Sequence, residues 1–122
     1  MYEVSQETMV AAAHQLRISP GEGERLHGHN WRIRAILRAE HLDSRGMVVD
    51  FNDLGRELRA FVEPWEHVFL NELSPWNDVN PTAENIARVV AEGLAQKLDD
   101  DRVKVVRVEV WETDTCGATY HR

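Results

Sequence analysis

The sequence predicts an α+β domain in which a four-stranded antiparallel sheet carries two helices on one face, in the order ββααββ. Apolar and polar residues alternate with a period of two in residues 27–39 and 103–113, as in half-buried strands. Between these segments, apolar residues recur at helical spacing in residues 51–65 and 83–98. At 122 residues, the chain is expected to form one domain spanning residues 1–122.

A first strand is expected over residues 8–16, because no helix start signal precedes this apolar segment, although its three alanines would also suit a helix. A turn cluster at residues 19–23 then leads to an antiparallel partner at residues 27–39. The polar side chains of that second strand, which include Arg32, Arg34 and Arg38, point to the face opposite its apolar residues. This face is interpreted as exposed to solvent; contact with another subunit and attraction of phosphate are the alternatives.

The first helix is expected to begin at Asp50, whose carboxylate can accept hydrogen bonds from the free amides of the first turn. It is expected to end near Val62 or Glu63, because Pro64 disfavours helical geometry in the residue before it.

The second helix has two candidate caps. Either Asn80 caps it, with Pro81 at the first helical position, or Thr82 does so together with Asn85. The aspartates at residues 99–101 end it. Two strands complete the order, at residues 103–113 and 118–120.

The composition argues against several kinds of partner. The formal net charge of −7 disfavours nucleic acid and anionic membranes, although a local patch can oppose the global sign. No apolar run approaches the roughly 20 residues of a membrane span, and the first residues lack the features of a signal peptide. The single cysteine, Cys116, excludes an internal disulfide and fits a reducing cytoplasm, where we expect the protein to act.

Three histidines are predicted to hold a metal ion. His27 and His29 are two residues apart in a strand, so their imidazoles share a face, and Gly28 between them permits close approach. In the neighbouring first strand, His14 lies on the same face as Val10 and Ala12. Three neutral imidazoles would leave one position of a tetrahedral zinc ion open for substrate. The alternative is that His27 and His29 are two surface histidines on a loop.

Acid–base candidates lie in two loops. Glu24, three residues before His27, is a candidate general base beside the metal, with Glu22 as its competitor and an exposed loop glutamate as the alternative. His67 directly follows Glu66, and adjacent residues of an extended segment point apart. The two therefore form a dyad only if the loop is kinked; a structural histidine is the alternative.

Glu112 ends a valine-rich strand on its apolar parity, where a carboxylate needs partners. Such a group could accept two N–H bonds from the guanidine-like edge of a pterin or guanine ring; the alternative is a surface glutamate at a strand end. Cys116 is predicted to be a small buried side chain rather than a nucleophile. His41 and His121 are predicted to lie at the surface.

Six pieces of the chain resemble the 6-pyruvoyl-tetrahydropterin synthase and 6-carboxy-tetrahydropterin synthase family. They appear in family order and cover nearly the whole chain, which makes the set far more specific than the His-Gly-His alone. These pieces are Ala12-Ala13-His14, Leu26-His27-Gly28-His29-Asn30, Gly46-Met47-Val48-Val49-Asp50-Phe51, His67 with Leu70-Asn71, Asn80-Pro81-Thr82-Ala83-Glu84-Asn85, and Glu112-Thr113 followed by Tyr120.

The resemblance implies a tunnelling fold, in which sheets join into a barrel, as a homohexamer of two stacked trimers. It implies zinc on the three histidines already named, and a pterin ring anchored by Glu112 with Thr113 beside it. It implies a lyase acting on 7,8-dihydroneopterin triphosphate; the carboxy branch of the family feeds queuosine biosynthesis and the pyruvoyl branch feeds tetrahydrobiopterin.

Two departures from the family pattern put the reaction outcome in doubt. The usual catalytic cysteine is replaced by Gly23, and the usual aspartate before His67 is replaced by Glu66. Glu24 instead fits the Glu-x-x-His-Gly-His pattern of members that make 6-hydroxymethyl-dihydropterin. The first hypothesis is therefore a zinc-dependent synthase with Glu24 as base. The alternatives are side-chain cleavage to 6-hydroxymethyl-dihydropterin, a pterin-binding homologue without synthase activity, and a zinc-stabilised assembly protein.

Overall fold

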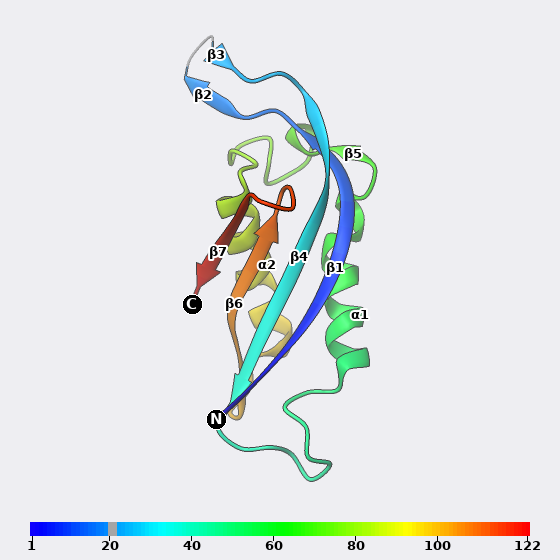
Figure 1. The fold of residues 1–122 in the computed structure, drawn as a ribbon, viewed down its shortest axis with the longest axis vertical. Helices are drawn as coiled ribbons and strands as arrows, with labels where there is room; N and C mark the ends of the chain where they lie inside the picture. The colour runs from blue at the N-terminus through cyan, green and yellow to red at the C-terminus, as the bar shows by residue number, and fades with distance from the viewer. Residues whose placement is uncertain (20–21) are drawn as a thin grey trace.

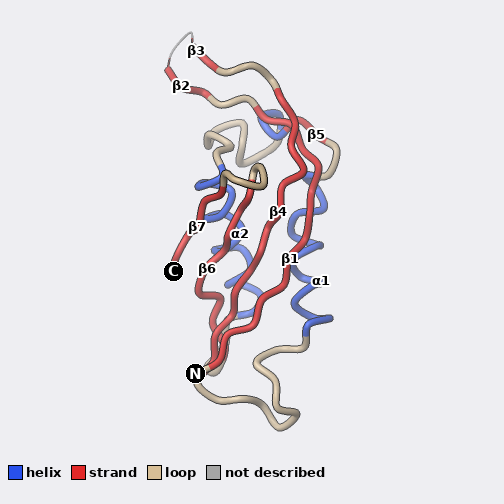
Figure 2. The backbone as a smooth tube through the Cα atoms, in the orientation of Figure 1, coloured by secondary structure: helices blue, strands red, loops and turns tan. Residues whose placement is uncertain are grey.

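The computed structural model describes residues 1–19 and 22–122. One sheet, in the order β5-β1-β4-β6-β7, is covered on a single face by two helices (Figures 1 and 2). A separate short hairpin, β2-β3, projects beyond one end of the sheet. The elements are β1 (Tyr2–His14), β2 (Arg17–Ser19), β3 (Glu22–Gly23), β4 (His27–Ala39), α1 (Phe51–Val62), β5 (Val68–Phe69), α2 (Ala83–Leu98), β6 (Val103–Trp111) and β7 (Gly117–His121), with short 3₁₀ turns at Glu63–Trp65 and Leu70–Glu72.

The predicted four antiparallel strands are present, and the structure adds a fifth. Strand β5 pairs in parallel with β1 through Val68 and Phe69, so the sheet is mixed, with one parallel pair at its edge. The loop after α1 is fastened to the edge of β1 at one residue. The N–H of Ala11 donates to Glu66 Oε1 at 3.1 Å, and the N–H of His67 donates to Ala11 O at 2.6 Å.

Strands β1 and β4 pair along their whole length, from Tyr2 opposite Ala39 to His14 opposite His27. This long ladder explains why β1 begins at Tyr2 rather than at Thr8, the start expected from apolar content. The turn cluster predicted at residues 19–23 includes residues 20 and 21, which lie outside the described residues, as does the side chain of Glu22.

The core fills the space between the sheet and the two helices. Its largest fully buried side chains include Trp31, Trp76, Ile33, Leu37, Leu54, Leu58, Leu70, Ile86 and Leu94. One strand departs from simple alternation. The ladder between β4 and β6 shifts register beside Ile36, so Val105 and Val108 are buried while Val106 is only half-buried. A bulge changes which parity faces the core, so period-two alternation, which predicts that Val106 shares the buried face of Val108 and Val110, is wrong for Val106.

Both helix starts follow from side-chain caps. Asp50 Oδ1 accepts a hydrogen bond from the N–H of Asn52 at 2.8 Å, as expected. For α2, Thr82 Oγ1 accepts from the N–H of Asn85 at 3.1 Å, which decides between the two candidate caps in favour of Thr82. The segment from Asn80 to Pro81 is thereby left outside the helix, where its polar groups contact β1 and β2.

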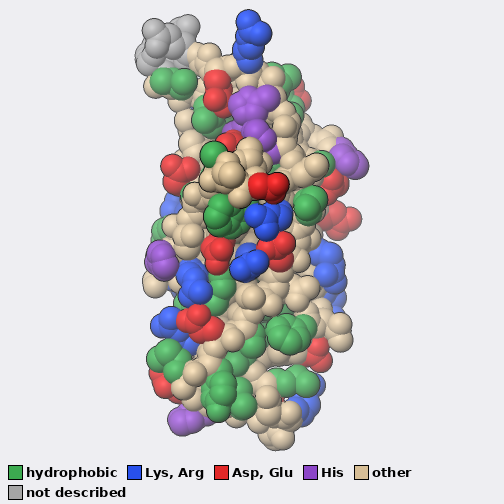
Figure 3. Space-filling view, viewed as in Figure 1, with side chains coloured by type: hydrophobic (Ala, Val, Ile, Leu, Met, Phe, Trp, Pro, Cys, Tyr) green, Lys and Arg blue, Asp and Glu red, His purple; other side chains and the backbone are tan. Residues whose placement is uncertain are grey.

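The face of the sheet that no helix covers is charged, as expected from the alternate arginines of the strand at residues 27–39. Cross-strand pairs join Arg34 to Glu7 at 3.1 Å and Arg107 to Glu3 at 3.1 Å. Figure 3 shows acidic and basic side chains interspersed on the face in view, with histidines gathered toward the hairpin end. Among the described residues, no helix has the length and apolar character needed to cross a membrane.

Candidate metal centre

Three imidazoles converge where β1 and β4 reach the hairpin end of the sheet. His14 faces His27 across the ladder, and His29 faces Ala12, so all three side chains lie on the helix-covered side. One ligand atom from each of these histidines, together with one from Glu112, lies within 4.8 Å of the others. The three predicted histidines are therefore brought together, and Glu112, predicted for ring binding, joins them.

Backbone carbonyls orient two of the rings. His14 Nδ1 lies 2.8 Å from Pro81 O, and His27 Nδ1 lies 2.7 Å from Arg25 O. A carbonyl oxygen only accepts, so in each neutral ring Nδ1 carries the proton and Nε2 presents a lone pair. The two Nε2 atoms face each other at 3.0 Å. Two lone pairs at that distance repel unless a cation lies between them, and this orientation is typical of metal-binding histidines.

Two carboxylates add further acceptors to the same place. Glu112 Oε1 lies 3.0 Å from His14 Nε2 and 3.3 Å from His29 Nε2. Glu24 Oε1 lies 3.5 Å from His27 Nε2 and 4.0 Å from His14 Nε2. Glu24 Oε1 and His29 Nε2 are buried without a hydrogen-bond partner among the described residues. A cradle rich in acceptors and poor in donors fits a cation, and its imidazole nitrogens suit zinc or a similar transition metal.

Burial lowers the pKa of His29 below its ordinary value, because the charged imidazolium loses hydration there. The Glu112 carboxylate opposes this effect and raises that pKa, whereas positive charge on His14 or His27 lowers it further. The net direction keeps His29 neutral, which is the form that binds a metal ion.

The chain after His14 is held by two asparagine side chains. Asn71 accepts from the N–H of Gln15 at 2.9 Å and donates to its carbonyl at 2.7 Å. Asn80 does the same for Arg17, at 2.9 and 2.8 Å. The Gln15 side chain then donates to Glu24 O at 2.9 Å. Nothing in the sequence marked these amides as supports, although both lie in the family-like pieces.

Replacing Asn80 with alanine is expected to lower the free energy of unfolding by about 1–2 kcal/mol, since two hydrogen bonds are lost. It should also weaken metal binding, because Asn80 holds the backbone that follows His14. Chemical denaturation of the metal-free protein and zinc titration measure the two effects. Asn77→Ala in the same loop is the control, since its side chain makes no hydrogen bond to any residue that the structure describes. Equal losses in both variants would contradict this role for Asn80.

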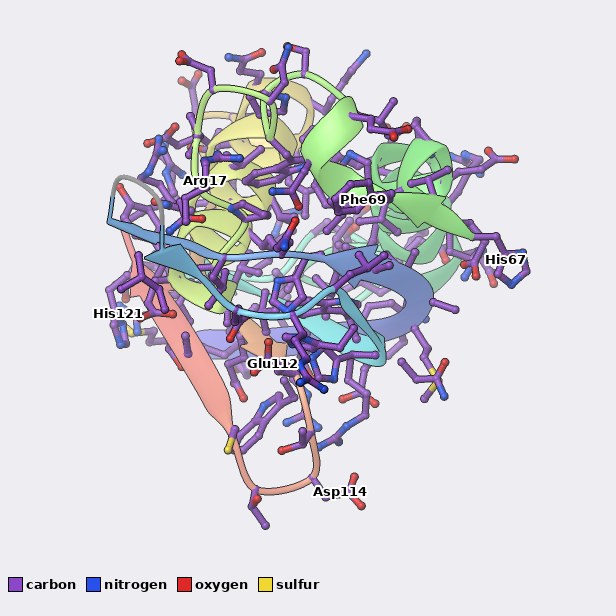
Figure 4. The ribbon with its side chains drawn as sticks, turned by 90° about the horizontal axis from the view of Figure 1, so that it is seen from above. Arg17, His67, Phe69, Glu112, Asp114 and His121 are labelled. Atoms are coloured by element: carbon purple, nitrogen blue, oxygen red, sulfur yellow. The ribbon has the colours of Figure 1, made fainter. Side chains whose placement is uncertain are left out.

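The Glu66–His67 pair forms away from the cluster. His67 has a left-handed backbone with φ of +59°, which supplies the kink that pairing requires. Its Nε2 lies 3.2 Å from Glu66 Oε1, and its side chain is 80% exposed. Figure 4 shows His67 at the periphery, pointing away from Glu112 near the centre. Within the described chain, His67 therefore stands apart from the candidate metal centre.

Two further expectations concern the turn after β6. Cys116 is exposed, so the prediction of a buried thiol was wrong. The Thr113 hydroxyl accepts from the N–H groups of Thr115 and Cys116 at 3.3 and 3.1 Å, so this hydroxyl caps a turn. Turn-forming polarity at residues 113–116 keeps the segment at the surface. His41 and His121 are exposed, as predicted.

The fold and the cluster define an α+β protein with a three-histidine candidate metal centre at one end of its sheet. The family model for 6-pyruvoyl tetrahydropterin synthase matches residues 3–122, and the chain belongs to this family.

Two relatives and one solved structure illustrate the similarity. The chain is 34% identical to dihydroneopterin monophosphate aldolase of Pyrococcus furiosus, covering 87% of this chain and 85% of that protein. It is 34% identical to 6-carboxy-5,6,7,8-tetrahydropterin synthase of Synechocystis sp., covering 98% and 93%. The structure of Caenorhabditis elegans 6-pyruvoyl tetrahydropterin synthase superposes with a TM-score of 0.85 at 24% identity, covering 99% of this chain and 95% of that one. The last likeness shows the shared tunnelling fold.

Proposed function

We propose that this protein is a zinc-dependent lyase acting on 7,8-dihydroneopterin triphosphate or a close relative, in the cytoplasm. The observation that carries the proposal is the convergence of three imidazoles, two of them oriented by backbone carbonyls, and two glutamates in a chain of this family. The matched relatives are named for pterin substrates or products, which supports a pterin as the ligand. In this proposal His14, His27 and His29 hold zinc, and Glu112, with Thr113 beside it, binds the ring.

The roles of the side chains follow from their positions. A zinc ion held there would polarise a side-chain hydroxyl or carbonyl and acidify the neighbouring hydrogen. Glu24 Oε1 is buried beside this place without a donor in the described part of the chain, so it is available to accept a proton. The Glu112 carboxylate can accept two N–H bonds from the guanidine-like edge of a pterin ring.

Side-chain cleavage to 6-hydroxymethyl-dihydropterin is the second candidate outcome. Gly23 cannot transfer a proton, whereas Glu24 lies 3.5 Å from His27 Nε2. A relative 34% identical is named an aldolase for dihydroneopterin monophosphate. A solved Plasmodium vivax 6-pyruvoyltetrahydropterin synthase, in which a glutamate described as its catalytic residue is replaced by alanine, gives a precedent for glutamate in this role.

Product identification tests the proposal and separates the two outcomes. The zinc-loaded protein is incubated with dihydroneopterin triphosphate, and in parallel with the monophosphate, and products are identified by mass spectrometry. A tetrahydropterin with a shortened or oxidised side chain indicates synthase chemistry, and 6-hydroxymethyl-dihydropterin indicates cleavage. Pterin binding without turnover would instead indicate a binding protein. Zinc loss that unfolds the protein, with no pterin bound, would indicate a zinc-stabilised assembly protein.

The proton relay is proposed to come from a second copy of the chain. His67 pairs with Glu66 at the far edge of the sheet, away from the cluster of its own chain. An oligomer, which we expect to be a homohexamer, would bring this pair to a neighbouring cluster, so each site would be built from two subunits.

Mixing two inactive variants tests this arrangement. His67→Ala and Glu24→Gln are each expected to lose most activity, but they damage different halves of a shared site. Random co-assembly should restore about a quarter of the sites, because one site in four then draws intact residues from both copies. Activity of the mixture is compared with each variant alone. If both residues served the site of their own chain, mixing would restore nothing.

A further inference from the structure

Glu112 occupies the place of a fourth ligand. Its Oε1 lies 3.0 Å from His14 Nε2 and 3.3 Å from His29 Nε2, and the Nε2 of His14 presents a lone pair because its Nδ1 donates to Pro81 O. Bonds of 2.0–2.2 Å from zinc to nitrogen or oxygen place neighbouring tetrahedral ligands about 3.3–3.5 Å apart. The two separations at Glu112 lie at or slightly below this spacing. Glu24 Oε1 lies 3.5 Å from His27 Nε2 but 4.0 Å from His14 Nε2. The ligand atoms of the three imidazoles and Glu112 all lie within 4.8 Å of one another, so these four residues could form a closed ligand set around one ion.

A closed set conflicts with catalysis, because catalytic zinc sites keep one position for water or substrate. It also conflicts with ring binding. A carboxylate that accepts two N–H bonds from a guanidine-like edge must direct both oxygens at the ring, and it cannot also direct one at the metal.

We propose that Glu112 is an exchangeable ligand. In the ring-free protein it completes the coordination of the metal; an incoming pterin ring withdraws it and opens the fourth position for the side chain of the same substrate. This rests on the proposed function, since the ring is its trigger. The exchange would keep the metal closed until a ring is in place.

The surroundings of Glu112 allow its side chain to move while its backbone stays fixed. Its N–H donates to Cys116 O at 2.9 Å, which anchors the backbone directly after β6. Its side chain is 28% exposed and borders a cavity of about 400 Å³, shared with Glu84 and Cys116. Oε1 of this carboxylate lies beside the imidazoles, and the residue also lines a space within the size range of small-molecule pockets.

The exchange predicts the direction in which zinc changes the affinity of the protein for the ring. Metal and ring compete for one carboxylate, so zinc-loaded protein should bind a bare ring more weakly than metal-free protein. By reciprocity, the ring should weaken zinc binding by the same factor, expected to be about 5- to 150-fold. The probe is pterin without a side chain, which has no side-chain hydroxyl to offer the metal. Its affinity is measured by fluorescence titration with and without zinc.

A second measurement addresses the ligand role alone. Glu112→Gln should lower the zinc affinity of ring-free protein by at least about tenfold, and should change the visible absorption of the cobalt-substituted protein. Glu84→Gln is the matched control, because it removes the same charge from the same cavity without touching the cluster. Adding pterin should shift the cobalt spectrum of the wild type and of this control, and leave that of Glu112→Gln unchanged.

The outcomes separate this proposal from the proposed function. Unchanged zinc affinity in Glu112→Gln, or ring binding that zinc leaves equal or strengthens, overturns the exchange while pterin chemistry stands. A protein that binds no ring with or without zinc overturns both.

Discussion

Replacing His27 with alanine is expected to remove the bound metal and, with it, measurable turnover. His27 supplies one of three imidazoles whose Nε2 atoms converge, and its orientation is fixed by Arg25 O at 2.7 Å. Removing a group that hydrogen-bonds to a metal ligand already lowers metal affinity by about 10- to 100-fold. Removing the ligand itself should therefore lower metal affinity by more than about 100-fold. Because the His27 side chain is 36% exposed, the fold should tolerate its truncation better than that of the fully buried His14.

Zinc stoichiometry after dialysis, zinc affinity by competition with a chelator, and thermal unfolding of the metal-free protein together check this expectation. His41→Ala is the control, since His41 is exposed and outside the cluster. A His27→Ala protein that retains one tightly bound zinc per chain would remove His27 from the ligand set. A large loss of stability without metal would show a structural role instead.

The histidine cluster could be predicted because it depends on strand parity. Residues two apart in a strand share a face, so His27 and His29 had to point together once residues 27–39 formed a strand. The antiparallel partner then set His14 opposite His27. Parity also placed Glu112 on the side of Val108 and Val110, and the structure brings it to the same cluster.

The support of the cluster could not be predicted, because backbone groups provide much of it. The carbonyls of Pro81 and Arg25 orient two rings, and any residue at those positions would present the same oxygen. Strand β5 has only two residues, too few for a periodic pattern. The bulge beside Val106 and the exposure of Cys116 depend on tertiary contacts and turn geometry, which hydrophobic patterning does not contain.

The backbone is closely packed at Gly23, the position where the family usually carries its catalytic cysteine, and Glu24 follows directly. A Cβ added at Gly23 would lie 3.2 Å from the carbonyl oxygen of Leu16, which is tight for a backbone contact. The next residue donates its N–H to the same oxygen at 3.3 Å. A cysteine at position 23 would therefore require the backbone at Leu16 and the backbone at residue 23 to move slightly apart. The close approach is compatible with glycine, and in the proposed mechanism the neighbouring carboxylate of Glu24 would accept the proton instead.

Glu24→Gln is accordingly expected to lower kcat by about 10²- to 10⁴-fold, the usual contribution of a positioned general base. Glutamine keeps the length of the side chain but cannot accept the proton. Metal binding should change little, because Glu24 Oε1 lies 4.0 Å from His14 Nε2, beyond the spacing of neighbouring ligands around a tetrahedral zinc ion. Steady-state kinetics with dihydroneopterin triphosphate and monophosphate, on protein of verified zinc content, measure the effect.

The split between kcat and metal content distinguishes a base from a ligand. A fall in kcat at full zinc occupancy supports proton transfer by Glu24, whereas parallel loss of zinc and activity would make it a ligand. A variant as active as the wild type would exclude Glu24 from the mechanism and direct attention to the Glu66–His67 pair. That pair is exposed and joined at 3.2 Å, so proton transfer in an assembled oligomer would then depend on Glu66 and His67 together.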